Sequence, residues 1–119
     1  MPNYGSKEQL YKDTLTNWIE TGCGLWATPV ERAERDADLN VLSVKVKDIE
    51  DEDAPIHTVT LDTIQTGFAR VREREVKSLH GDYAAHIEHA WRENDGGMID
   101  ANDSDIVVQA GLFNECIYG

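Results

Sequence analysis

Three histidines, His80, His86 and His89, lie close together in the second half of the chain. In a helix of about 3.6 residues per turn, His86, His89 and Glu93 fall on one flank. Two imidazoles and a carboxylate are ligands that Zn²⁺ accepts, so these three residues form a candidate metal site. Their spacing matches neither the His-Glu-x-x-His pattern of metalloproteases nor a zinc-finger pattern. The spacing favours the alternative, a solvated polar helix face.

A second candidate for metal binding is the aspartate-rich run 100–105, which is similar to the start of a calcium-binding EF-hand loop. The run lacks the glycine that such loops have at position six. Gly111 occupies position twelve, where the loop requires a bidentate glutamate. These departures favour a helix N-terminus enriched in acids, which complements the helix dipole.

The basic residues cluster once, at Arg70, Arg72, Arg74 and Lys77. Arg70 and Arg74 lie one helical turn apart and form a candidate anion-binding pair, because a guanidinium binds phosphate or carboxylate groups through two donors. Acidic residues are interleaved with these arginines, so local ion pairing is the alternative.

The residue types give no support for catalysis or for a bound cofactor. Cys23 lies between two glycines, but no local signature of a catalytic cysteine accompanies it. A phosphate-binding glycine loop is absent, and carboxylates are too numerous for any one pair to indicate acid–base chemistry. We therefore expect a protein that is not an enzyme, with Cys23 and Cys116 reduced and buried.

Acidity is the strongest compositional signal, since 23 acidic residues against 11 basic ones give a net charge of −12. This charge argues against direct binding of nucleic acid. It fits either solubility, including adaptation to a salty cytoplasm, or a surface that binds a basic partner. Two segments, 48–53 and 95–105, concentrate the acids. The candidate partner-binding residues are Asp48, Glu50, Asp51, Glu52, Asp53, Asp100, Asp103 and Asp105.

Helical spacing of apolar residues predicts four main helices that would position these groups. They begin near residues 7, 61, 82 and 105, and the first ends near residue 21. Ser6, Thr60 and one residue of 102–104 are the expected caps of the first, second and last helix. A further short helix is predicted over 28–36, because a threonine followed by proline is a helix start signal.

The period changes to two at residues 42–47, and this alternation predicts a half-buried strand. Residues 56–59 predict a second strand, with the acidic stretch 48–53 at the tip of an antiparallel hairpin. Residues 25–27 are a candidate third strand. The expected fold class is therefore α+β: a short antiparallel sheet packed with three to four helices.

The length of 119 residues fits one globular domain over 1–119. No apolar run approaches the roughly 20 residues of a membrane span, and residues 1–11 lack the pattern of a signal peptide. We expect a cytoplasmic protein that does not contact a membrane. The expected core residues are Tyr11, Leu15, Trp18, Val44, Val46, Leu61, Ile64, Phe68, Ile87, Trp91, Val107, Ala110 and Phe113.

An aspartate-rich turn, a Val-Val-Gln helix and a terminal Tyr-Gly make up the C-terminal run 97–119. This run resembles the ending of small uncharacterised proteins encoded by actinobacterial phages and prophages, with Asn114 where glycine is expected. The segment 58–64 is similar to their threonine-rich step from strand to helix. The resemblance implies a phage-like origin and an intracellular host setting, and it implies no activity and no site residues.

The leading functional expectation is a non-enzymatic binding protein that uses its acidic surface. The partner would be a protein with a basic surface, or a second copy of the chain in a homo-oligomer. In a phage setting, an inhibitor of a host protein or a nucleic-acid mimic fits this description. Two alternatives stay open: a small-ligand or metal-binding domain at the sites above, and a self-assembling structural component of a phage.

Overall fold

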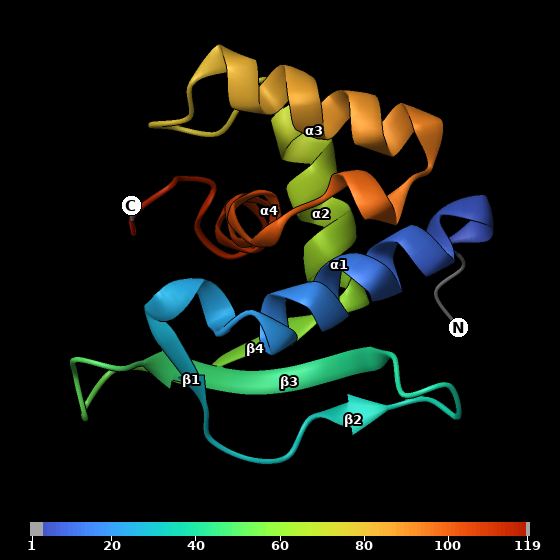
Figure 1. Ribbon diagram of the computed structural model, residues 1–119. Helices are drawn as coiled ribbons and strands as arrows, with labels where there is room; N and C mark the ends of the chain where they lie inside the picture. Colours follow the sequence, from blue (N-terminus) through green and yellow to red (C-terminus); the bar gives the residue numbers. More distant parts are fainter. Residues whose placement is uncertain (1–3, 119) are drawn as a thin grey trace.

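The structure, a computed structural model, describes residues 4–118. In this part of the chain, four helices lie on one face of a four-stranded sheet (Figure 1). This arrangement confirms the predicted α+β class. None of the helices in this part of the chain is long and apolar enough to cross a membrane. The elements are η1 (Gly5–Lys7), α1 (Glu8–Glu20), η2 (Cys23–Leu25), β1 (Ala27–Pro29), β2 (Glu34–Arg35), β3 (Val41–Asp48), β4 (His57–Thr60), α2 (Leu61–Arg72), α3 (Gly81–Glu93), η3 (Gly96–Met98) and α4 (Ala101–Phe113), where η marks a short 3₁₀ helix.

Strand β3 is the centre of the sheet, because the other three strands all pair with it in antiparallel register. Val46 pairs with Pro29 of β1 on one edge and with His57 of β4 on the other. Val44 and Val46 are buried while Lys45 is exposed, as expected for a strand with one face against a core. The predicted alternation and the predicted hairpin of β3 and β4 are therefore confirmed.

Residues 28–36 contribute to strands β1 and β2, so the predicted short helix is wrong. The long strand β3 presents backbone groups along both edges, and these groups need partners. Thr28 pairs with β3, and Pro29 is tolerated beside it because an edge strand does not need every N–H. The third strand expected over 25–27 begins only at Ala27, since Leu25 belongs to η2.

Side-chain caps fix the starts of α2 and α4. Thr60 caps α2 as predicted and forms a reciprocal capping box with the residue three positions on. Asp100 caps α4, ahead of the predicted 102–104, and accepts a hydrogen bond from the Asp103 N–H at 2.8 Å. The predicted Ser6 cap is wrong, because α1 begins after η1 with no side-chain cap.

Helix α4 lies at the centre of the molecule, with α1, α2 and the sheet around it (Figure 1). Residues 103–110 are all buried, and apolar side chains on every side are typical of a fully buried helix. Two glycines let α2 and α4 approach closely. A Cβ atom on Gly67 would lie 2.0 Å from the carbonyl oxygen of Val107, and one on Gly111 would lie 2.2 Å from that of Thr63.

The predicted core residues are buried, with two exceptions. Trp91 and Phe113 are half-buried and pack against the edge of the core. The Arg72 guanidinium and the Lys7 ammonium lie over the Trp91 ring, 3.8 and 4.1 Å from its centroid, so cations contact this half-buried ring.

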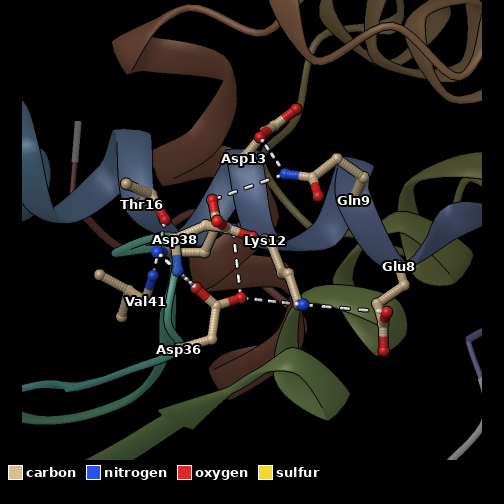
Figure 2. Close-up of polar contacts among 9 residues, drawn as sticks. Glu8, Gln9, Lys12, Asp13, Thr16, Asp36, Asp38 and Val41 are labelled. Carbon is tan, nitrogen blue, oxygen red and sulfur yellow. Dashed lines mark hydrogen bonds and ion pairs between the residues drawn. The ribbon is translucent and has the colours of Figure 1, made fainter.

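A polar cluster joins α1 to the turn before β3 (Figure 2). The Asp36 carboxylate lies 3.0 Å from the Lys12 ammonium of α1 and accepts a hydrogen bond from the Asn40 N–H at 3.0 Å. Beside it, the Thr16 hydroxyl accepts a hydrogen bond from the Val41 N–H at 2.8 Å. The hydrogen bond from Lys12 is the main cause that lowers the pKa of Asp36 from 3.8 to about 2.

Candidate functional site

Asp105 is an acidic side chain in the middle of the core, with an exposed fraction of only 9%. Its Oδ1 atom accepts hydrogen bonds from the indole N–H groups of Trp18 at 3.0 Å and Trp26 at 2.8 Å. Its Oδ2 atom accepts one from the Gln109 amide at 2.7 Å. Within residues 4–118, no lysine or arginine forms an ion pair with Asp105. The carboxylate is therefore held by neutral N–H donors.

Gln109, one turn further along α4, fastens the C-terminal segment to the core. Its Oε1 atom accepts hydrogen bonds from the N–H groups of Ile117 at 2.7 Å and Tyr118 at 2.9 Å. Its amide nitrogen donates to the Tyr118 carbonyl as well as to Asp105. These bonds use both donors and both acceptor positions of the amide, so Gln109 has a structural role and no free group for a ligand.

A cleft of about 520 Å³ opens beside Asp105, between η2, the segment 78–80, the start of α4 and the C-terminal segment. Leu25, Leu79 and Ile106 supply apolar walls, and Asp105 and Asn102 contribute polar groups. Small-molecule sites have volumes of about 300–1,000 Å³ and combine apolar walls with a few convergent polar groups. The cleft therefore has the size and lining of a ligand site.

The backbone on two sides of this cleft adopts conformations that most residues avoid. Leu25 and Ser78 have positive φ angles of 66° and 64°, and the Leu25 side chain is 83% exposed. Gly24, between Leu25 and Cys23, is confined by contact, because a Cβ atom there would lie 2.1 Å from Asp105 Oδ1. Left-handed backbone is unfavourable for bulky residues, and strained residues of this kind cluster at functional sites.

The two cysteines lie near Asp105 but lack the environment of a reactive thiol. Cys23 is buried, and burial together with the Asp105 charge raises its pKa to about 11. Burial likewise raises the pKa of Cys116, which lines the cleft. A thiol with a raised pKa is a poor nucleophile at neutral pH, so neither cysteine supports covalent catalysis.

The acidic loop 48–53, which we call the acidic tip, is ordered by its own carboxylates. Asp48 accepts a hydrogen bond from the Glu50 N–H, and Asp51 accepts one from the Asp53 N–H, both at 2.9 Å. The Tyr118 hydroxyl also donates to Asp48 at 2.8 Å. The Glu50 N–H and this hydroxyl lower the pKa of Asp48. The tip thus holds its charges in a defined arrangement.

A hollow of about 150 Å³ lies at the base of the acidic tip. Leu25 and Ile49 form part of its wall, and their side chains are 83% and 54% exposed. Trp26 and Tyr118 also line the hollow, and their rings stack with centroids 4.3 Å apart. Asp48 and Glu50 complete the lining, so exposed apolar groups and carboxylates meet at one place.

Only some of the acidic residues predicted to form a partner surface are exposed in the structure. Asp103 and Asp105, at 3% and 9% exposure, are buried and face the protein interior, which corrects the sequence prediction for these two residues. Asp103 belongs to the capping box of α4 and Asp105 binds two indoles. Asp100 is exposed but uses its carboxylate as the helix cap. In Figure 1 the acidic tip and η3 lie on opposite sides of the molecule, so the two acidic segments do not form one array.

The three residues of the predicted metal site, His86, His89 and Glu93, do not act together in the structure either. His86 Nε2 lies 3.1 Å from Asp103 Oδ2 and 2.9 Å from the Met98 carbonyl oxygen. His89 and Glu93 are exposed, and among the described residues no hydrogen bond or ion pair joins them to that pair. Across residues 4–118, no three His, Cys, Asp or Glu side chains are placed to share a metal ion. The geometry thus gives the predicted site no ligand set.

The predicted anion-binding arginines both have partners inside the protein. Arg70 donates to the carbonyl oxygens of Ala110 and Gly111 at the end of α4, at 2.8 and 3.2 Å. Arg74 pairs with Glu88 of α3 at 2.9 Å. The two guanidinium groups therefore join α2 to its neighbours and are not presented together to solvent.

No protein-family model, curated protein or solved structure matches this chain.

Proposed function

We propose that this chain is a non-enzymatic binding protein that engages a basic protein partner through the acidic tip. The observation that carries the proposal is the meeting of exposed carboxylates with exposed apolar side chains around the hollow at its base. Large apolar side chains with a polar rim are typical of protein interaction sites. Because the rim is acidic, a partner with basic residues would be complementary.

The hollow suggests how the partner would be anchored. Its volume of about 150 Å³ suits one side chain, and its lining combines apolar and acidic side chains. An arginine or lysine has the matching form, with an aliphatic stem and a charged end. The stem would pack against Leu25 and Ile49, and the cation would pair with Asp48 or Glu50. Turn hydrogen bonds already order the tip, so binding would cost little conformational entropy.

The state of the basic cluster supports an external partner over a second copy of the chain. Arg70 and Arg74 have partners inside the protein, and Arg72 lies over the Trp91 ring. A homo-oligomer that joined the acidic tip to these three arginines would compete with their contacts inside the protein, whereas the fourth member of the cluster, Lys77, is exposed. The resemblance of the C-terminal run to phage proteins suggests a host protein in the bacterial cytoplasm as the partner, and an inhibitor or a nucleic-acid mimic as the role.

Affinity capture with paired variants tests this proposal. The tagged protein is used to capture partners from a lysate of an actinobacterial host at about 50 mM and about 500 mM NaCl, since salt screens exposed charges. One variant neutralises the tip, through Glu50→Gln, Asp51→Asn, Glu52→Gln and Asp53→Asn. The matched control neutralises four exposed glutamates elsewhere, through Glu20→Gln, Glu34→Gln, Glu73→Gln and Glu93→Gln. Both variants change the net charge from −12 to −8, because each removes four negative charges.

We expect the wild type and the control to capture the same partner at low salt and to lose it at high salt, while the tip variant captures none. The proposal fails if both variants lose the partner equally, because total charge and not the tip would then determine binding. Capture that is insensitive to salt would also contradict it.

A further inference from the structure

We propose that the cleft beside Asp105 binds a small organic cation, namely a primary ammonium or guanidinium group carried on an apolar body. The cleft shares Leu25 and Tyr118 with the hollow at the base of the acidic tip, but the proposal does not depend on the function proposed there. Three observations carry it: the charge of Asp105, the lining of the cleft and the conformation of the backbone that forms its rim.

The first observation is a buried carboxylate that has no cation. Asp105 lines the cleft, is 9% exposed and accepts hydrogen bonds only from neutral groups among the described residues. Its Oδ2 atom accepts one hydrogen bond, from Gln109, although a carboxylate oxygen can accept two. A buried charge is unfavourable unless it is paired. A ligand cation would supply the countercharge at Oδ2.

The second observation concerns the rest of the lining, which fits an apolar body better than an anion. Leu25, Leu79 and Ile106 present aliphatic surface to the cleft, and Tyr83 presents an aromatic ring that is 50% exposed. None of the described residues that line the cleft is a lysine or an arginine. A carboxylate or phosphate ligand would therefore meet Asp105 with no lysine or arginine to compensate, and among the described lining residues only the His80 imidazole could carry a positive charge.

The third observation is that the rim keeps an unfavourable conformation. Leu25 holds a large apolar side chain in solvent on a left-handed backbone, and Ser78 across the cleft is also left-handed. Such features persist where the surrounding structure needs them. A ligand body in the cleft would cover Leu25 and remove its contact with water.

The tryptophan indoles provide a direct readout. The indole N–H groups of Trp18 and Trp26 donate to Asp105, whereas that of Trp91 donates to the Tyr11 hydroxyl and serves as an internal control. Nitrogen–proton correlation NMR spectra of the full chain resolve these groups. The probes are phenethylamine, which is an ammonium at pH 7, its neutral analogue phenethyl alcohol, and the anion phenylpropionate.

We expect phenethylamine to shift the Trp18 and Trp26 indole signals with a dissociation constant on the order of 1 mM, while the Trp91 signal stays in place. The alcohol should bind with an affinity at least about tenfold lower, because it lacks the charge-assisted hydrogen bond. The anion should not bind. Equal binding of amine and alcohol, or no shift with the amine, would overturn the proposal.

A substitution that blocks the cleft without removing Asp105 completes the test, because Asp105 also supports the fold. Ala101→Phe places a ring in the cleft from an exposed position at the start of α4. Ala85→Phe is the control, from an exposed position on α3 that does not line the cleft. Phenethylamine should bind the Ala85 variant as it binds the wild type and should lose at least about tenfold in affinity for the Ala101 variant. Equal affinity for the two variants would place the ligand elsewhere and refute the site.

Discussion

At the scale of single residues, Asp36 shows how one carboxylate can stabilise a junction between elements. It connects the turn before β3 with α1 through an ion pair to Lys12 and hydrogen bonds to its own turn. These contacts lower its pKa from 3.8 to about 2, with the Lys12 hydrogen bond as the largest cause. The folded state therefore binds a proton at Asp36 less readily than the unfolded state does.

This difference predicts a specific loss of stability in acid. The contribution of Asp36 is present in full above its unfolded pKa of 3.8 and disappears as the pH falls to about 2, because the unfolded chain takes up the proton first. Urea unfolding measured across this range should show a steeper decline for the wild type than for Asp36→Asn, which keeps the side-chain shape but not the charge. Parallel declines would show that Asp36 makes no such contribution.

The burial of Asp105 could not be predicted from the residues next to it in the sequence. The local sequence predicts an exposed side chain for Asp105, because an aspartate-rich run before a helix normally faces solvent. Its partners, Trp18 and Trp26, come from positions 87 and 79 residues earlier in the chain. Only the tertiary fold brings these indoles together. One local signal was present: apolar residues on all sides of 106–110 indicate a buried helix, and a buried helix has no solvated face for Asp105.

At the scale of elements, the crossing of α2 and α4 depends on glycine. Gly67 of α2 lies against the Val107 carbonyl of α4, and Gly111 of α4 lies against the Thr63 carbonyl of α2. The two contacts are reciprocal, so the helix backbones themselves are in contact. A side chain at either glycine would push the central helix away from its neighbour.

Gly67→Ala should therefore destabilise the protein by about 1–3 kcal/mol, the usual cost of overpacking. The expected loss runs against helix propensity, which favours alanine over glycine by about 1 kcal/mol. Gly81→Ala at the start of α3 is the matched control, since a Cβ atom there has nothing within 4 Å. Urea unfolding monitored by tryptophan fluorescence compares the two variants. A Gly67 variant as stable as the Gly81 variant would mean that the two helices can separate freely.

Local patterns predicted the elements whose partners lie nearby in the chain. The hairpin of β3 and β4 and the cap of α2 at Thr60 depend on adjacent residues, and both are confirmed. The threonine and proline of segment 28–36 form a good local start signal and predict a helix that does not form. The edge of β3 offers that segment backbone hydrogen bonds, and these outweigh a local preference that is weak in a short helix.

At the scale of the whole molecule, most of the acidic charge has no partner of opposite sign. The chain carries 23 acidic residues, yet the carboxylates that pair with lysine or arginine within residues 4–118 are only those of Glu8, Glu31, Asp36 and Glu88. The remaining charge repels itself in the folded state. The acidic tip is one concentration of that charge, and η3 and its neighbours on the opposite side are another (Figure 1).

The excess of repulsion over attraction predicts that salt stabilises the folded state. Raising NaCl from about 20 mM to about 500 mM shortens the Debye length and screens repulsion throughout the molecule, whereas few ion pairs are lost. The free energy of unfolding in urea at neutral pH should therefore rise, by on the order of 1 kcal/mol. The variant with four surface glutamates changed to glutamine, at a net charge of −8 in place of −12, should show a smaller rise because it has less repulsion to screen. A fall in stability with salt would mean instead that the few ion pairs, such as Lys12 with Asp36, outweigh the net charge.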